Sequence, residues 1–268
     1  MRAAPEGPGS AVRKDGALMG EHLVTGAASG IGLATVRRLA AAGHRVWALD
    51  HNADRLERAL EAAGLPGVVR LIADVGDEAS VESAFQQVAA DADHLDGLVN
   101  CAGIIPVAPF EQHSVSDWER SYRVNVIGTY LVLRAALPLL RAGHGASVVN
   151  LASMAAKIPG PFTVAYNASK AAVISLTRSA AAALAPDIRV NAVCPGVVGT
   201  PMYEAIDARL HALGAPEMLR FEARAASAPA GRAASAEEIA TVIEFLLGPG
   251  AAFVTGEDVN VTGGFVMH

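Results

Sequence analysis

The sequence predicts an α/β fold in which one parallel, doubly wound sheet of about seven strands carries helices on both faces. Three observations predict it: short apolar segments alternate with helical ones, a glycine-rich turn follows the first strand, and polar residues recur just past the strand ends. Strands that alternate with helices form parallel sheets with right-handed crossovers. A chain of 268 residues is within the range of one large α/β domain, so we expect a single domain over residues 21–268.

The first strand, His22–Val24, leads into a glycine-rich turn and a helix that runs from Leu33 to Ala40 and stops at Gly43. The turn reads Thr25-Gly26-Ala27-Ala28-Ser29-Gly30-Ile31-Gly32. Glycines let the backbone approach a pyrophosphate, and the helix N-terminus offers free N–H groups and a positive dipole end. The spacing GxxxGxG meets the general GxGxxG fingerprint only in part, and the same glycines also fit a simple tight turn.

The second strand, Arg45–Leu49, ends at Asp50, eighteen residues past Gly32. A carboxylate at this point can accept hydrogen bonds from an adenosine ribose. It could also cap the next helix, or do both. Strand, turn, helix and acid together predict a Rossmann-like dinucleotide site.

The alternation continues to the end of the chain. We expect helices at Ala53–Ala63, Glu78–Ala90, Val115–Leu140, Tyr166–Leu184 and Ala236–Leu247, and strands at Val68–Ile72, Leu95–Val99, Ser147–Ala152, Ile188–Val193 and Asp258–Val261. We expect residues 202–226 to form a helical insertion. It is part of a mobile substrate lid that we expect near residues 198–228. Ligands of such sheets bind at the carboxyl ends of the strands. Residues just past strand ends therefore indicate one shared site: Gly26, Asp50, Asp74, Asn100, Ser153 and Pro195.

Ser153, Tyr166 and Lys170 are the candidate catalytic residues. Ser153 follows a predicted strand, and Lys170 follows Tyr166 by four residues, one turn along the same helix face. A cation within ~4–6 Å favours a phenolate and lowers the phenol pKa from its ordinary value near ~10. Such a phenol can exchange a proton with an alcohol or a carbonyl oxygen. Tyr and Lys at this spacing also fit a solvated helix face, but the nucleotide fold around them favours catalysis.

Composition argues against several functions. The chain is 52% hydrophobic and carries a net charge of -6 without a basic cluster, so neither nucleic acid nor an anionic membrane surface is expected as a partner. No apolar run reaches the ~18 residues of a membrane span. Cys101 and Cys194 lack metal-ligand spacing, so we expect no metal and a reducing, cytoplasmic compartment. Residues 1–20 are interpreted as a disordered tail, with Met19 as an alternative start.

Motifs over about residues 20–268 resemble those of the short-chain dehydrogenase/reductase family, in its compact single-domain form. They are specific together and not singly: Thr25-Gly26…Gly30-Ile31-Gly32, Asp74-Val75, Asn100-Cys101-Ala102-Gly103, Asn125, Ser153, Tyr166…Lys170, Asn191, Pro195-Gly196 with Thr200, and Val261-Thr262-Gly263-Gly264. Two positions depart from the family pattern, Cys101 in place of an Asn and Ala236 in place of a Pro. Neither touches the expected chemistry.

The resemblance implies hydride transfer between NAD(H) and a secondary alcohol or ketone. It implies that Tyr166 exchanges the proton, that Lys170 lowers the Tyr166 pKa and holds the nicotinamide ribose, and that Ser153 hydrogen-bonds the substrate oxygen. Asn125 would help a water join Lys170 to solvent; from the residues alone it is an ordinary polar helix residue. The implied cofactor-binding residues are Gly26, Ser29, Gly30, Ile31, Gly32, Asp50, Asp74, Val75, Asn100, Ala102, Gly103, Tyr166, Lys170, Pro195, Gly196, Val198 and Thr200.

The expected substrate contacts are Ile105, Ser153, Tyr166, Met202 and Tyr203. Residues 197–207 are similar to the lid of bacterial sugar-alcohol and small secondary-alcohol dehydrogenases, although the lid residues could simply cover the cofactor. An acyl-carrier-protein ketoreductase is the rival enzyme, but such enzymes usually have Arg where this chain has Ser29. A dinucleotide-binding regulatory protein without turnover is the third alternative, and the complete catalytic set argues against it.

Two more expectations concern the cofactor and the assembly. We expect NAD rather than NADP, because Asp50 would repel a 2′-phosphate and the glycine turn holds no cation. Arg55 is the nearest cation and is more easily interpreted as solvated. The helices at Val115–Leu140 and Tyr166–Leu184 carry more Ala, Val and Leu than one buried face needs, which together with the resemblance predicts a homotetramer with two-fold symmetries.

Overall fold

A computed structural model describes residues 19–267, and these form a single seven-stranded parallel sheet in the order β3-β2-β1-β4-β5-β6-β7. The strands are β1 (Glu21–Thr25), β2 (Arg45–Asp50), β3 (Val69–Ile72), β4 (Gly97–Asn100), β5 (Ser147–Leu151), β6 (Arg189–Pro195) and β7 (Asp258–Val261). The predicted α/β class is confirmed. The tail prediction for residues 1–18 lies outside the described residues, whereas Gly20 already donates a backbone hydrogen bond to His44 Nδ1 at 3.0 Å.

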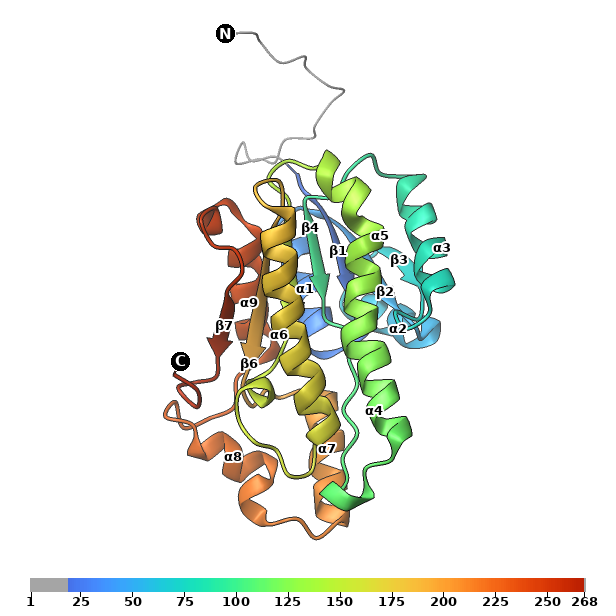
Figure 1. The fold of residues 1–268 in the computed structure, drawn as a ribbon. Coiled ribbons are helices and arrows are strands. Elements are labelled where there is room, and N and C mark those ends of the chain that lie inside the picture. The colour runs from blue at the N-terminus through green and yellow to red at the C-terminus, as the bar shows by residue number, and fades with distance from the viewer. Residues whose placement is uncertain (1–18, 268) are drawn as a thin grey trace, which may run out of the picture.

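Helices cover both faces of the sheet (Figure 1). One face packs under α1 (Gly30–Ala41), α2 (Ala53–Ala62) and α9 (Ala236–Leu247), and the other under α3 (Glu78–Ala89), α5 (Thr129–Ala142) and α6 (Val164–Leu184). Each face encloses its own apolar cluster, so the central strands are buried on both sides, as parallel sheets require. Most predicted boundaries lie within two residues of those observed, since apolar period and breakers mark them in the sequence.

The predicted helix at Val115–Leu140 exists as a run of 28 residues, Val115–Ala142, but it is not regular. It consists of α4 (Val115–Tyr122), a π-helical turn (Arg123–Gly128) and α5. A Cβ at Gly128 would lie 2.9 Å from Val75 Cγ2, so glycine permits the close approach of this turn to the sheet. By length and composition alone the run could cross a membrane, but the core helix of a globular protein meets the same criteria, and 44% of its most apolar part is buried.

The insertion predicted at residues 202–226 is helical, and it lies at the carboxyl ends of the strands (Figure 1). It contains α7 (Pro201–Ala212), a 3₁₀ turn (Glu217–Leu219) and α8 (Phe221–Ser227). Thr200 caps α7 by accepting a hydrogen bond from Tyr203 N, and Pro201 occupies the first helical position, where its missing N–H costs nothing. The mobility of this segment stays a prediction.

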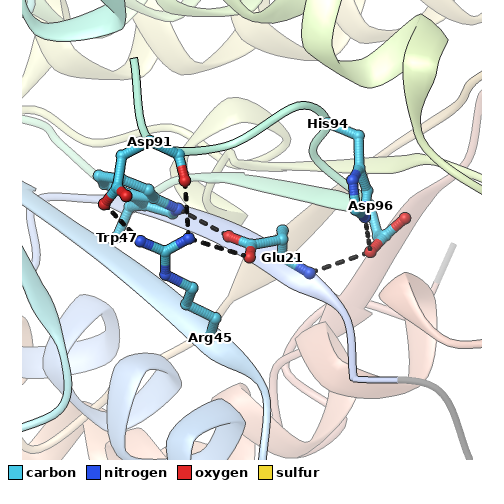
Figure 2. A network of polar contacts seen from close by, with 6 residues as sticks. All are labelled: Glu21, Arg45, Trp47, Asp91, His94 and Asp96. Atoms are coloured by element: carbon cyan, nitrogen blue, oxygen red, sulfur yellow. Dashed lines mark hydrogen bonds and ion pairs between the residues drawn. The ribbon is translucent and has the colours of Figure 1, made fainter. Parts of the chain in front are cut away.

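The opposite, amino-terminal edge of the sheet is tied by polar side chains (Figure 2). Arg45 donates to Asp91 and to Glu21, and the indole N–H of Trp47 donates to the second oxygen of Glu21 at 3.0 Å. Asp96 in turn accepts from the backbone N–H of Glu21 at 2.9 Å. These contacts fix β1, β2 and the start of β4 relative to one another. They lie at the edge of the sheet opposite the carboxyl ends of the strands.

Candidate active site

A cleft of 1540 Å³ runs along the carboxyl ends of the strands, from the glycine turn to α7 and α8. It is lined by nearly all the residues that we expected to bind cofactor or substrate. The exception is Asn100, and Asn125 of the expected catalytic residues does not line the cleft either. The predicted shared site at the strand ends is therefore one continuous cavity.

The glycine turn has the geometry that a close-lying anionic group needs. Gly26 and Gly30 adopt φ values of 65° and 53°, a region that disfavours any residue with a Cβ. A Cβ at Gly26 would lie 2.8 Å from Ala102 N, and one at Gly32 would lie 2.2 Å from Gly26 O. The turn thus brings the start of α1 to the cleft with its first N–H groups free, as pyrophosphate binding requires.

Asp50 is the last residue of β2 and is buried, with an exposed fraction of 8%. Oδ2 accepts from Ala28 N and Oδ1 from Asn52 N, both at 3.1 Å. Asn52, not Asp50, caps α2 by accepting from Arg55 N. Of the two roles considered from the sequence, the capping role is therefore excluded, and Asp50 is left as an oriented carboxylate at the cleft wall. Arg55 also lines the cleft.

Asp74 and Asn100 differ in where their side chains lie. Asp74 is exposed in the cleft and accepts from Gly76 N at 2.8 Å, while Asp77 caps α3. Asp74 itself is therefore not the N-cap of α3. Asn100 instead donates into the core, from Nδ2 to Asn150 Oδ1 at 2.9 Å. Asn100 therefore does not line the cleft, which the sequence pattern could not show.

Ser153 and Tyr166 meet at the base of the cleft through a side-chain hydrogen bond. Lys170 approaches the same ring, with Nζ 5.7 Å from its centroid, and donates to Leu151 O at 2.5 Å. Burial lowers the pKa of Lys170 to about 8, because the charged ammonium is taken out of water. The helical spacing of Tyr166 and Lys170 and the strand-end position of Ser153 thus bring all three together.

The expected lowering of the Tyr166 pKa by Lys170 is not what the chain produces. Burial raises the pKa of Tyr166 to about 12, and the bond with Ser153 only partly opposes it. The chain's own groups therefore keep Tyr166 as a neutral phenol at pH 7. The sequence argument counted a cation nearby and omitted the larger cost of desolvation.

Asn125 lies in the π turn and is fully buried. Its Oδ1 accepts from Ile104 N at 2.9 Å, while Nδ2 donates to Ile104 O at 3.0 Å and to Ser169 Oγ at 2.9 Å. It therefore clamps the loop after β4 against α6. A Cβ at Gly103 would lie 3.2 Å from Asn125 Oδ1 and 3.5 Å from Lys170 Nζ, so the clamp and the ammonium are neighbours.

The other end of the cleft is walled by Ile105 and by the insertion, where Met202 and Tyr203 line it as expected. Tyr203 packs edge-on against Phe221, with ring centroids 5.1 Å apart. Sequence reasoning missed Arg209 and Arg224, which also line the cleft. Arginines in a polar helical insertion carry no pattern that distinguishes a cavity wall from a solvated face.

Comparisons with known proteins find relatives that match nearly the whole chain. The model of the family described as "Enoyl-(Acyl carrier protein) reductase" matches residues 26–266. The chain is 37% identical to a cyclopentanol dehydrogenase of Comamonas over 92% of its length and 96% of that protein. It is also 37% identical to a D-threitol dehydrogenase of Mycolicibacterium smegmatis, over 91% and 92%.

A solved structure shows the same fold. It is a short-chain dehydrogenase/reductase from Brucella melitensis, titled glucose/ribitol dehydrogenase, with a TM-score of 0.83 and 33% identity. The match covers 92% of this chain and 97% of that one.

Proposed function

The chain belongs to the short-chain dehydrogenase/reductase family, and we propose that within it the enzyme is an NAD-preferring dehydrogenase of a small secondary alcohol or polyol. As a member it is an oxidoreductase that acts on CH–OH groups and interconverts alcohols and ketones. The relatives named for cyclopentanol and D-threitol support a substrate of small size, cyclic or linear. The compartment we propose is the cytoplasm, from the cysteine content.

The observation that carries the proposal is the Ser153–Tyr166 pair at the base of the cleft with Lys170 beside it. In ketone reduction the neutral phenol of Tyr166 donates its proton to the substrate oxygen and becomes a phenolate, and in alcohol oxidation that phenolate takes the hydroxyl proton and becomes the phenol again. Ser153 holds the same substrate oxygen by a hydrogen bond. Lys170 stabilises the phenolate form. Asn125 holds the neighbouring loop and keeps Lys170 in place. The dinucleotide, bound between the glycine turn and Asp50, would supply the hydride acceptor.

The test is the absorbance change at the nicotinamide band with a panel of cyclic alcohols, linear secondary alcohols and polyols, each with NAD and with NADP. Oxidation of at least one class is expected. No absorbance change with any alcohol or corresponding ketone under either cofactor would remove the proposal.

The preference for NAD rests on Asp50. Its carboxylate is held by Ala28 N and Asn52 N and lines the cleft where the adenosine ribose is expected. A 2′-phosphate there would meet a like charge, at a cost of about 1 kcal/mol at 4 Å in water and more where water is excluded. Arg55 lines the same end and is the one group that could offset this repulsion, so the preference needs a direct measurement.

A second candidate is reduction of a 3-oxoacyl thioester, which the carrier-protein description of the matching family model favours. The glycine turn has Ser29 where such enzymes usually carry Arg, which weighs against it. A 3-oxoacyl thioester in the substrate panel separates the two candidates. A regulatory protein without turnover is no longer a candidate, because the chain belongs to an enzyme family, and Ser153, Tyr166 and Lys170 line one cleft.

We also propose a homotetramer. Along α4, the π turn and α5, large apolar side chains stay exposed in one row: Val115, Trp118, Tyr122, Ile127 and Tyr130. Tyr122 and Ile127 are five residues apart, the spacing of one π turn, so the π segment keeps them in line. Phe245 on α9, at the opposite face of the sheet, is 53% exposed. The row on α4 and α5 and the exposed Phe245 on α9 support two different two-fold interfaces, as a tetramer of this symmetry needs.

A further inference from the structure

The charges that line the cleft are distributed unevenly. The whole chain is acidic, with a net charge of -6, yet among the described residues Asp50 and Asp74 are the only acids in the cleft lining. Asp50 ends β2 and Asp74 lies two residues past the end of β3, at the end of the cleft where the adenosine is expected. The lining cations extend over the full length: Arg55, Arg120, Arg123, Lys170, Arg209 and Arg224. The substrate end therefore holds positive charge without a lining carboxylate.

Arg224 is the cation of that end whose own partners are incomplete. It lies on α8, with its guanidinium carbon 5.3 Å from the ring centroid of Phe265. Its Nε is buried without a hydrogen-bond partner, and no carboxylate of the described residues forms an ion pair with it. Arg220, one turn earlier, also has a buried Nε without a partner, but it pairs with Asp207 at 3.4 Å and does not line the cleft. A buried charged donor without an acceptor is costly, so a ligand that brings acceptors would recover that cost.

The surroundings of Arg224 connect it to the reacting groups. Burial raises the pKa of Tyr203, and the positive charge of Arg224 is the first group that opposes this rise. Tyr203 in turn is close enough to act on the pKa of Tyr166. Met154 and Ile158, which belong to one apolar cluster with Tyr203, also line the cleft, as does Leu219. A molecule held at Ser153 and Tyr166 thus extends over an apolar surface toward a cation.

We propose that the substrate carries a carboxylate on an apolar body, and that Arg224 binds this carboxylate while Ser153 and Tyr166 hold the alcohol or ketone oxygen. The proposal rests on the proposed function and narrows its substrate class. The planar guanidinium fork can donate two parallel hydrogen bonds to a carboxylate, which fixes orientation as well as charge.

The first experiment compares charged and neutral substrates of equal shape. The probes are the 2-, 3- and 4-hydroxycyclohexanecarboxylates and their uncharged carboxamides, with kcat/KM measured for each. For the isomer whose carboxylate can reach Arg224, we expect kcat/KM to be roughly 10- to 100-fold higher for the carboxylate than for its carboxamide. This is the range for a charge-assisted hydrogen bond. Arg224→Gln should reduce this ratio to near one, and Arg224→Lys should retain part of it.

Arg220→Gln is the matched control, since it removes a cation of the same segment that does not line the cleft. It should keep the carboxylate-to-carboxamide ratio even if packing of the insertion lowers both rates. A ratio near one in the wild-type enzyme overturns the inference while the proposed function stands. An equal loss for both substrates in Arg224→Gln also overturns it, because Arg224 would then only support packing.

The second experiment needs no turnover. Cyclohexanecarboxylate and cyclohexanecarboxamide lack the reacting oxygen, and their binding to the enzyme–NADH complex is measured by calorimetry, together with NADH affinity itself. Tighter binding of the carboxylate that is lost in Arg224→Gln supports the inference. Equal binding of both, or weaker NADH binding as the main effect of the variant, contradicts it. If no alcohol is oxidised at all, the proposed function fails, and calorimetry still decides on the carboxylate.

Discussion

Among single substitutions, one at Tyr166 tests the proposed chemistry most directly. Its hydroxyl bonds Ser153, and its ring contacts Lys170 from one turn away. Tyr166→Phe keeps the ring and removes only the transferable proton, so folding and NADH binding should persist. We expect kcat to fall by roughly 10²–10⁴-fold. The thermal unfolding midpoint and NADH fluorescence serve as controls, and turnover within a few fold of wild type would contradict the assignment.

The expected preference for NAD over NADP also depends on a single residue, Asp50. Asp50→Ala removes the carboxylate and leaves Ala28 N and Asn52 N without their acceptor. With Arg55 at the same wall, we expect the kcat/KM ratio of NAD to NADP to fall by about 10-fold or more, the equivalent of ~1.4 kcal/mol. Arg55→Gln is the complementary variant and should raise the ratio. Equal or higher kcat/KM with NADP in the wild-type enzyme would show that Asp50 does not select the cofactor.

At the scale of elements, β1 places His22 in the core near the amino-terminal edge. A Cβ at Gly97 would lie 2.2 Å from His22 Nδ1, so glycine there makes room for the ring. Neither ring nitrogen has a hydrogen-bond partner among the described residues. The pKa of His22 is lowered to about 3, mainly by burial and then by the charge of His44, while the charge of Asp96 opposes both.

This burial makes stability depend on pH. The unfolded chain takes up a proton at His22 below pH ~6.5, whereas the folded chain does not do so until near pH 3, so stability falls as the pH falls between these values. Going from pH 7 to 5 should cost roughly 2 kcal/mol from this residue, at ~1.4 kcal/mol per unit below 6.5. Denaturant unfolding at both pH values and one protein concentration measures it.

His22→Phe keeps a ring of similar shape that cannot be protonated. It should reduce the loss of stability between pH 7 and 5, whatever its own effect at pH 7. His144→Asn, an exposed histidine of the same edge, should leave that loss unchanged. An identical pH dependence in wild type and His22→Phe would show that the loss arises elsewhere.

The elements also show which parts of the site a sequence can reveal. Strand ends and the four-residue spacing of Tyr166 and Lys170 depend on local pattern, and these were predicted. The π turn was not, because an apolar helix pattern looks the same with one residue more per turn. The direction of Asn100 depends on Asn150, fifty residues later in the chain, and Arg224 depends on how α8 folds back over the cleft. Neither leaves a local signal.

For the whole molecule, the testable question is assembly. The exposed row on α4 and α5 and the exposed Phe245 on α9 lie on opposite faces of the sheet. Within one chain, therefore, neither can cover the other. The apolar area of each is best covered by its own copy across a two-fold axis. We therefore expect light scattering at micromolar concentration to give four times the chain mass of 27.5 kDa.

Ile127→Glu tests whether the exposed row on α4 and α5 forms one of the two subunit interfaces. Ile127 lies in the middle of the exposed row, 38% exposed, and a two-fold axis there would bring the introduced carboxylate close to its own copy. Burying a charge in an apolar interface is unfavourable, so the row should open while the α9 interface holds, giving dimers. Met218→Glu is the control, because Met218 is also apolar and 73% exposed but lies on the insertion. Dimers from Ile127→Glu with tetramers from Met218→Glu would support two interfaces, whereas a wild-type monomer would exclude both.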